Sequence, residues 1–222
     1  MKQKLTILFD LDGTMVDTAP DLIRAHNHVM KKFGYPTKTL GELKNAVGKG
    51  AKAMMAKANG QWKWFDEKIQ NEMTDEFLSY YGKNIANESK LIKGVEEFLV
   101  WCKKNSISMA VCTNKTEHLA IDLLKQIKIY DYFEYVAGYN TFEYCKPDPR
   151  HLTNVVEILQ GDVKKTIMAG DSETDAESAK AANMPFILVE GGYTDKNPDE
   201  IYHNYLVKDF INLEKLVLPY IN

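Results

Sequence analysis

Two aspartates stand one residue apart where an apolar run near the start of the chain ends. Asp10 and Asp12 close the segment ILFDLD and are followed at once by Gly13 and Thr14. A second pair, Asp171 and Asp175, follows another apolar run. Carboxylate and carbonyl oxygens suit Mg²⁺, which leaves its other coordination positions to water and substrate phosphate oxygens. The four acids therefore predict a Mg²⁺ site that handles phosphate.

Polar side chains with different chemistry follow two further apolar runs. Thr113 and Asn114 end the run ISMAVC, and Lys146 comes soon after the run YFEYVAG. A hydroxyl, an amide and an ammonium group are suited to phosphate oxygens. We therefore expect these three residues to bind the phosphate.

The elements that must position these residues alternate along the chain. Short apolar runs typical of strands cover residues 5–10, 107–114, 132–138, 166–172 and 185–192. Stretches with an apolar face at helical spacing cover residues 94–105, 116–127 and 148–160. This alternation predicts a parallel sheet with helices on both faces. Parallel strands end at one edge, where such sheets bind ligands, so the polar residues should converge there.

One long region breaks the alternation. Residues 18–88 have helical patterns throughout, with Pro20 suited to a first helical turn and Gly34 to a helix end. The predicted fold is α/β, with a Rossmann-like parallel-sheet core of residues 1–17 and 89–222. The expected all-helical cap domain, residues 18–88, is inserted after the first strand.

Composition limits the possible partners and locations. The 222 residues are 45% hydrophobic and 27% charged, with a net charge of −3. This balance gives no basic footprint for nucleic acid. No stretch approaches the roughly 20 apolar residues of a membrane span, and the N-terminal apolar run is too short for a signal peptide. We expect a cytoplasmic monomer or homodimer with no nucleic-acid or membrane partner.

The acids also have purely structural interpretations. Asp10 and Asp12 could belong to a solvated turn after a strand. Asp171 and Asp175 could cap a helix or complement its dipole from the first turn. The same capping role is assigned to two further acids, Asp17 and Asp21.

The other polar residues have structural alternatives too. Thr113 and Asn114 could cap the helix that begins near Thr116. Lys146, which precedes Pro147, could be a surface lysine in an extended segment. The coincidence of all these residues at strand ends favours a shared site.

At this point the sequence resembles the haloacid dehalogenase superfamily, in its phosphoglycolate-phosphatase-like branch with a helical cap. The resemblance lies in four motifs in order: DLDGTMVDTAPD (10–21), TNK (113–115), KPDP (146–149) and GDSETDAESAKAANM (170–184). The second and third motifs are weak alone, whereas the first and fourth in this order are highly specific.

The resemblance implies a role for each matched residue. Asp10 would be the nucleophile that forms an aspartyl-phosphate, and Asp12 the general acid and then the general base. Mg²⁺ would be held by the Asp10 carboxylate, the Asp12 backbone carbonyl and Asp171, with Asp175 in or near this ligand set. Thr113 and Lys146 would hold the transferring phosphoryl oxygens.

The helical insert would then be a mobile cap that excludes water and selects the leaving group. Its segment VGKGAKAMM (47–55) resembles the cap loop that faces the active site in this branch. Lys49 or Lys52 could meet an anionic group of the substrate there, although a glycine-flanked lysine is more often a solvated loop residue.

Three functions fit these residues. The first is a Mg²⁺-dependent phosphomonoester hydrolase of a small metabolite, phosphoglycolate or something similar. A sugar phosphomutase of the β-phosphoglucomutase type is the alternative, since it shares the motifs and returns the phosphoryl group to its substrate. A receiver-type signalling domain also uses an aspartyl-phosphate and Mg²⁺. It is less favoured because it needs neither a cap nor a leaving-group acid such as Asp12.

Overall fold

The computed structural model of the protein describes residues 4–47, 50–57 and 66–221. Six parallel strands form one sheet in the order β5-β4-β1-β6-β7-β8. Their bounds are Thr6–Phe9 (β1), Ser108–Cys112 (β4), Tyr135–Ala137 (β5), Thr166–Gly170 (β6), Phe186–Val189 (β7) and Tyr205–Val207 (β8). The predicted parallel-sheet fold is therefore confirmed.

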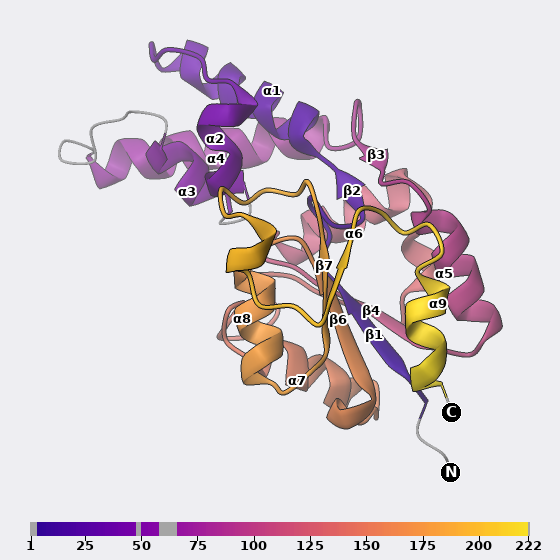
Figure 1. Cartoon of the computed structure of the whole chain (residues 1–222). Helices are drawn as coiled ribbons and strands as arrows, with labels where there is room; N and C mark the ends of the chain where they lie inside the picture. The colour runs from indigo at the N-terminus through magenta and orange to yellow at the C-terminus, as the bar shows by residue number, and fades with distance from the viewer. Residues whose placement is uncertain (1–3, 48–49, 58–65, 222) are drawn as a thin grey trace.

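Helices cover both faces of the sheet (Figure 1). The α-helices of this part of the chain are α5 (Val95–Lys104), α6 (Glu117–Gln126), α7 (Arg150–Ile158), α8 (Glu173–Ala181) and α9 (Glu214–Val217). Short 3₁₀ turns lie at Tyr130–Tyr132, Val163–Lys165, Pro198–Glu200 and Leu218–Tyr220.

The central strand shows why its sequence is almost wholly apolar. Ile7 and Phe9 pack in the cluster that includes the buried residues of α5, α6 and α9, whereas Leu8 packs in the cluster of α7 and α8. Successive side chains of a strand point to opposite faces, so a strand covered on both sides must be apolar at each position. Polar residues are then confined to the strand ends.

Among the described residues, four helices lie between the first two strands of the sheet in chain order. They are α1 (Ala19–Lys32), α2 (Leu40–Val47), α3 (Ala51–Lys57) and α4 (Glu67–Lys83). Helix α1 packs on α4, and α3 packs on both α4 and α2. Figure 1 shows these helices as a separate layer beyond the end of the sheet.

The chain enters and leaves this helical insert side by side. Strand β2 (Val16–Asp17) pairs antiparallel with β3 (Lys90–Leu91) at the two crossing points, a pairing that the sequence patterns did not predict. Two-residue strands are too short to give an alternation signal.

Asp21 also joins the two crossings, and the capping role assigned to it is wrong. Its buried carboxylate accepts hydrogen bonds from the backbone N–H groups of Glu88 and Ser89 and from the Ser89 hydroxyl. Arg24, one turn further along α1, also bonds it. Burial alone would raise the pKa of the Asp21 carboxyl, but these hydrogen bonds and Arg24 lower it overall. The acid stabilises a long-range contact and not its own helix end.

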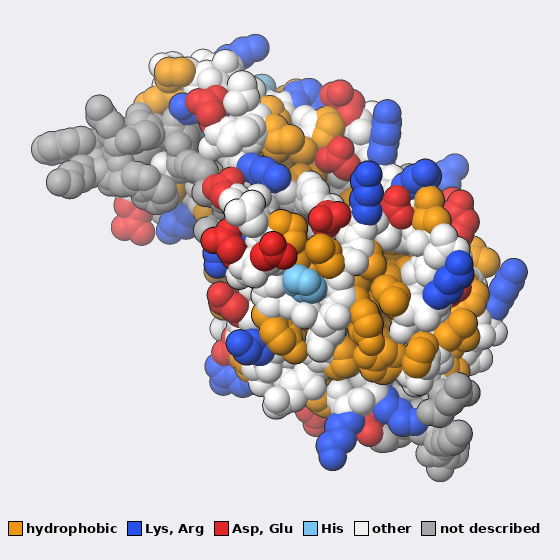
Figure 2. All heavy atoms as spheres, in the orientation of Figure 1, with side chains coloured by type: hydrophobic (Ala, Val, Ile, Leu, Met, Phe, Trp, Pro, Cys, Tyr) orange, Lys and Arg blue, Asp and Glu red, His pale blue; other side chains and the backbone are white. Residues whose placement is uncertain are grey.

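The surface carries charges of both signs. Figure 2 shows Lys, Arg, Asp and Glu side chains interspersed over the visible face, with hydrophobic side chains gathered on the sheet-bearing part. Leu206, Ile211 and Leu218 are the exposed hydrophobic residues nearest the C-terminus. Among the described residues, no helix has the length and apolar character needed to cross a membrane.

Candidate active site

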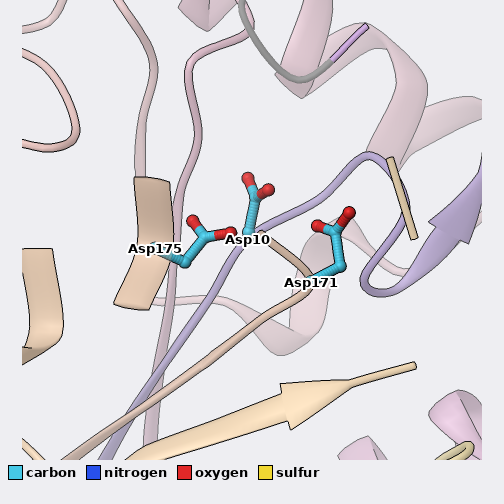
Figure 3. A group of neighbouring side chains, drawn as sticks. All are labelled: Asp10, Asp171 and Asp175. Atoms are coloured by element: carbon cyan, nitrogen blue, oxygen red, sulfur yellow. The ribbon is translucent and has the colours of Figure 1, made fainter. Parts of the chain in front are cut away.

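Three carboxylates meet where β1 and β6 end. Asp10 follows β1, Asp171 follows the neighbouring strand β6, and Asp175 lies in the first turn of α8. One oxygen from each lies within 4.8 Å of the others. Figure 3 shows the three side chains pointing the same way, with Asp10 between the other two. Two adjacent parallel strands thus bring together acids that are about 160 residues apart, as their ends were expected to do.

The Asp171 carboxylate is held in place by residues to which the sequence motifs gave no role. The Thr14 hydroxyl donates to one of its oxygens at 2.8 Å, and the Tyr193 backbone N–H donates to the other at 2.6 Å. Gly13 has a left-handed φ of 81°, and a Cβ there would lie 2.7 Å from the Asp171 carboxylate. Thr14 lies inside the first motif and could have been found from the sequence. Tyr193 gives no local signal.

Asp175 combines a structural and a charged contact. It accepts from the Ser172 hydroxyl at 2.7 Å and from the Ser172 backbone N–H at 3.2 Å, as part of the capping box of α8. Its second oxygen accepts from Lys146 Nζ at 2.5 Å. The capping interpretation is thus right for Asp175, although it does not exclude a further role. It is wrong for Asp171, which bonds Thr14 and Tyr193.

Lys146 lies inside the site, so the interpretation as a surface lysine is wrong. Its side chain is 1% exposed, and Nζ is 2.9 Å from Oδ1 of Asp10 as well as bonded to Asp175. Burial would lower the pKa of this ammonium group, but the two carboxylates raise it above its ordinary value. Lys146 is therefore a permanent positive charge beside Asp10.

The carboxylates carry more negative charge than Lys146 balances. Burial raises the pKa of Asp10 to about 6, and Asp175 and Asp12 add to this while Lys146 opposes it. Burial, followed by the charges of Asp175 and Asp10, raises the pKa of Asp171 well above its ordinary value. Crowded carboxylates with raised pKa values favour either protons or a cation. Their oxygen-only donor set fits a hard divalent ion such as Mg²⁺.

Thr113 and Asn114 lie at the same edge, directly after β4. Thr113 is buried and its hydroxyl accepts from the Lys115 backbone N–H at 3.2 Å. The Asn114 amide donates to the backbone carbonyl of Lys146 at 2.9 Å and ties the second motif to the third. Neither side chain caps α6, whose N-cap residue is Thr116. Both lie against the space above Asp10.

Asp12 points to the same space and is not a solvated turn residue. Its Oδ1 accepts from the Thr18 hydroxyl at 2.7 Å and from Lys115 Nζ at 2.8 Å. Lys115 also lies 3.0 Å from Oδ2. Lys115 directly follows Thr113 and Asn114 at the strand end. Its place in this motif is a sequence signal, although no role was assigned to Lys115 from the sequence.

A cavity of about 290 Å³ lies between the sheet edge and the helical insert. Its floor is polar and includes Asp10, Asp12, Thr113, Asn114, Lys146 and Asp175. Its opposite wall is largely apolar and comes from the insert: Leu22, Val47, Met54, Phe77, Leu78 and Tyr81. Lys52 is exposed and also lines the cavity, whereas Lys49 lies outside the described residues. A phosphate on the floor would thus have its ester group against the insert.

Comparison with known proteins gives the family. Residues 7–189 match the family model of haloacid dehalogenase-like hydrolases. The chain belongs to this family. The match spans every motif residue of the floor and the whole of the helical insert.

Relatives with similar sequences cover nearly the whole chain. A phosphoglycolate phosphatase of Mesorhizobium japonicum is 35% identical over 92% of this chain and 90% of its own length. A phosphoglycolate phosphatase of Agrobacterium fabrum is 37% identical over 95% and 93%. This haloacid dehalogenase-like protein is therefore an enzyme of the phosphatase type and not a receiver domain.

Solved structures agree in fold. A crystal structure from Haemophilus somnus, described as a predicted phosphoglycolate phosphatase, superposes with a TM-score of 0.91. It is 26% identical and covers 97% of this chain and 99% of its own. A β-phosphoglucomutase of Clostridium difficile has a TM-score of 0.80 at 22% identity, over 98% of this chain and 97% of its own. The last likeness shows the shared fold alone.

Proposed function

We propose that this phosphatase hydrolyses small phosphomonoesters with Mg²⁺, through an aspartyl-phosphate on Asp10. The observation that carries the proposal is the position of Asp10, whose carboxylate lies beside Lys146 and close to Asp171 and Asp175 on the floor of the cavity between the sheet edge and the insert. The position at which a phosphate would bind is thus surrounded by a nucleophile, a compensating cation and a set of acids that can bind a metal ion.

In the first step, an Asp10 oxygen attacks phosphorus and the bond between phosphorus and the ester oxygen breaks. Asp12 gives its proton to the departing oxygen. In the second step, water attacks the phosphorus of the aspartyl-phosphate, Asp12 takes the water proton, and the Asp10–phosphorus bond breaks. Lys146 and the Thr113 hydroxyl, with Asn114, hold the phosphoryl oxygens through both steps.

Mg²⁺ would be held by the carboxylates of Asp10 and Asp171 and by the Asp12 backbone carbonyl, with Asp175 in or near this set. When bound, the ion neutralises the charge of phosphate and carboxylates so that an anion can attack an anion. Asp175 also holds Lys146 in place, because one of its oxygens bonds the ammonium group.

The helical insert would act as a cap. We propose that residues 18–88 form this domain and that residues 1–17 and 89–222 form the core, with the β2–β3 pair at the boundary. Closing over the floor would exclude water while the aspartyl-phosphate forms. The names of the relatives favour phosphoglycolate as the substrate, and Lys52, which lines the cavity, would meet its carboxylate.

The test is phosphate release from a panel of phosphomonoesters, with Mg²⁺ and with EDTA. Phosphoglycolate, sugar phosphates, nucleoside monophosphates and p-nitrophenyl phosphate belong in the panel. Mg²⁺-dependent release is expected, fastest for phosphoglycolate. The mutase would instead be supported if phosphate were not released continuously and a sugar phosphate turned over only with a bisphosphate primer.

A further inference from the structure

Lys115 holds both oxygens of Asp12. Its Nζ lies 2.8 Å from Oδ1 and 3.0 Å from Oδ2, and the Thr18 hydroxyl donates to Oδ1 from the other side. The Lys115 side chain is 6% exposed and that of Asp12 is 13% exposed. Water therefore screens this ion pair far less than a surface pair.

The same ammonium group faces an aromatic ring of the helical insert. Nζ of Lys115 is 4.6 Å from the centroid of the Tyr81 ring, which belongs to α4 and is 1% exposed. A cation over an aromatic face is attracted by the ring quadrupole, and more strongly where both are desolvated. Lys115 thus touches Asp12 of the sheet edge and Tyr81 of the insert at once.

No other lysine on the described lining of the cavity makes such a bridge. Lys146 is committed to Asp10 and Asp175, and Lys52 is exposed. The Tyr81 hydroxyl has no hydrogen-bond partner among the described residues, so the ring face is the contact by which Tyr81 engages Lys115.

We propose that Lys115 is a positioning residue that aims the Asp12 carboxylate, and that the Tyr81 ring holds Lys115 in place only while the insert covers the sheet edge. Lys115 acts through the Asp12 carboxylate, which it bonds at both oxygens. Its ammonium group fixes the orientation of Asp12, and the insert controls that orientation through Tyr81. This inference rests on the proposed role of Asp12 as proton donor and acceptor.

Substitutions separate the positioning role from a general structural one. Lys115→Met should lower kcat for an alkyl phosphate at least tenfold more than kcat for p-nitrophenyl phosphate, whose leaving group needs little protonation. KM should change less than kcat. Lys115→Arg should restore part of the difference. Lys125→Met is the matched control, because Lys125 lies 5.1 Å from the Tyr130 ring and does not line the cavity.

The role of the insert is tested at Tyr81. Tyr81→Phe keeps the ring and should keep the ratio of the two kcat values, whereas Tyr81→Leu removes the ring and should shift the ratio as Lys115→Met does. Adding Tyr81→Leu to Lys115→Met should cause no further shift. Equal losses on both substrates in Lys115→Met, or equal effects of the Phe and Leu variants, would overturn the proposal.

Hydrogen exchange gives an answer that does not depend on turnover. Backbone amides of α4 around Tyr81 should exchange faster in Lys115→Met and in Tyr81→Leu than in wild type. In Lys125→Met their exchange rates should equal those of wild type. Unchanged exchange in both cavity variants would overturn the bridge. If wild-type enzyme released phosphate from no ester, the proposed function would fail, and the exchange rates would still decide whether Lys115 links the insert to Asp12.

Discussion

Tyr193 donates its backbone N–H to the carboxylate of Asp171 at 2.6 Å. Its hydroxyl, at the other end of the same residue, accepts from the backbone N–H groups of Thr18 and Ala19 at 2.8 Å each and donates to Asp17. Burial raises the pKa of this phenol, so it stays protonated and can donate to Asp17. Tyr193 therefore connects a proposed metal ligand with the first turn of the insert.

Replacing Tyr193 by Phe should destabilise the protein without removing its fold. Two buried N–H groups at the start of α1 would lose their shared acceptor, at a cost of about 1–3 kcal/mol in the free energy of unfolding. Urea denaturation measures this loss. Tyr202→Phe is the control, because Tyr202 is exposed and its hydroxyl bonds the nearby side chain of Asn204. A Tyr193→Phe variant as stable as the control would contradict a stabilising role of this hydroxyl at the start of α1.

Asp10→Asn should abolish turnover while the fold remains. An amide cannot form the aspartyl-phosphate, so kcat should fall at least about 1,000-fold. The raised pKa of Asp10, about 6, means that burial penalises the ionised form in the metal-free protein above that pH. The metal-free variant should thus melt at a temperature no lower than wild type at pH 7.5, by scanning calorimetry. Substantial residual activity would remove Asp10 as the nucleophile.

Asp12→Asn should affect substrates according to their leaving groups. Loss of a proton donor slows departure of an alkoxide far more than that of p-nitrophenolate, so the two kcat values should fall by factors that differ at least tenfold. Steady-state kinetics on both esters gives the comparison. Thr18→Val removes one hydrogen bond to Asp12 and should give a smaller difference. Equal losses with both esters would argue against proton donation, though not against a role as base in the second step.

The buried side chain of His151 should make the protein less stable in mild acid. It is fully buried, and desolvation, followed by the charge of Lys146, lowers its pKa from 6.5 to about 4. Between these values the unfolded chain binds a proton that folded His151 excludes, so the contribution of His151 to the free energy of unfolding falls as pH drops from 6.5 to 4. The total is about 3 kcal/mol.

Denaturation at a series of pH values measures this effect. His151→Gln removes the titrating group, so the stability of this variant should fall less than that of wild type between pH 6.5 and 4. His118→Gln, at an exposed position of α6, should leave the slope as in wild type. The raised pKa of Asp10 gives an opposite slope in the same window, so the difference between the wild-type and His151→Gln curves is the test. A slope unchanged in His151→Gln would show that His151 makes no such contribution.

The residues of the proposed active-site floor could be predicted because each of them follows a strand in the chain, and strands can be recognised from local sequence. Apolar runs mark the strands, and the polar residues that end them must share an edge when the strands are parallel. This reasoning predicts that Asp10 and Asp171 lie together, and the structure places them so. The helical insert could also be predicted from the sequence, because amphipathic periodicity over many turns is a strong signal.

The structural alternatives needed packing to decide them. A lysine before proline is a surface residue in most contexts, and only the strand order brings Lys146 beside Asp10 and Asp175. Asp21 carries the signature of a helix start, yet its partners are Glu88 and Ser89, 67 and 68 residues later. Local sequence specifies that such a side chain can accept hydrogen bonds, but not which donors approach it.

By itself, therefore, the sequence determined the parallel sheet, the inserted helices and the chemical types collected at the sheet edge. Only the tertiary structure decided the contacts between the two parts, such as Lys115 with Tyr81 and Tyr193 with the start of α1. The physical reason is range. Periodicity and turn chemistry act over a few residues, whereas these contacts depend on how helices that are distant in the chain pack against the sheet.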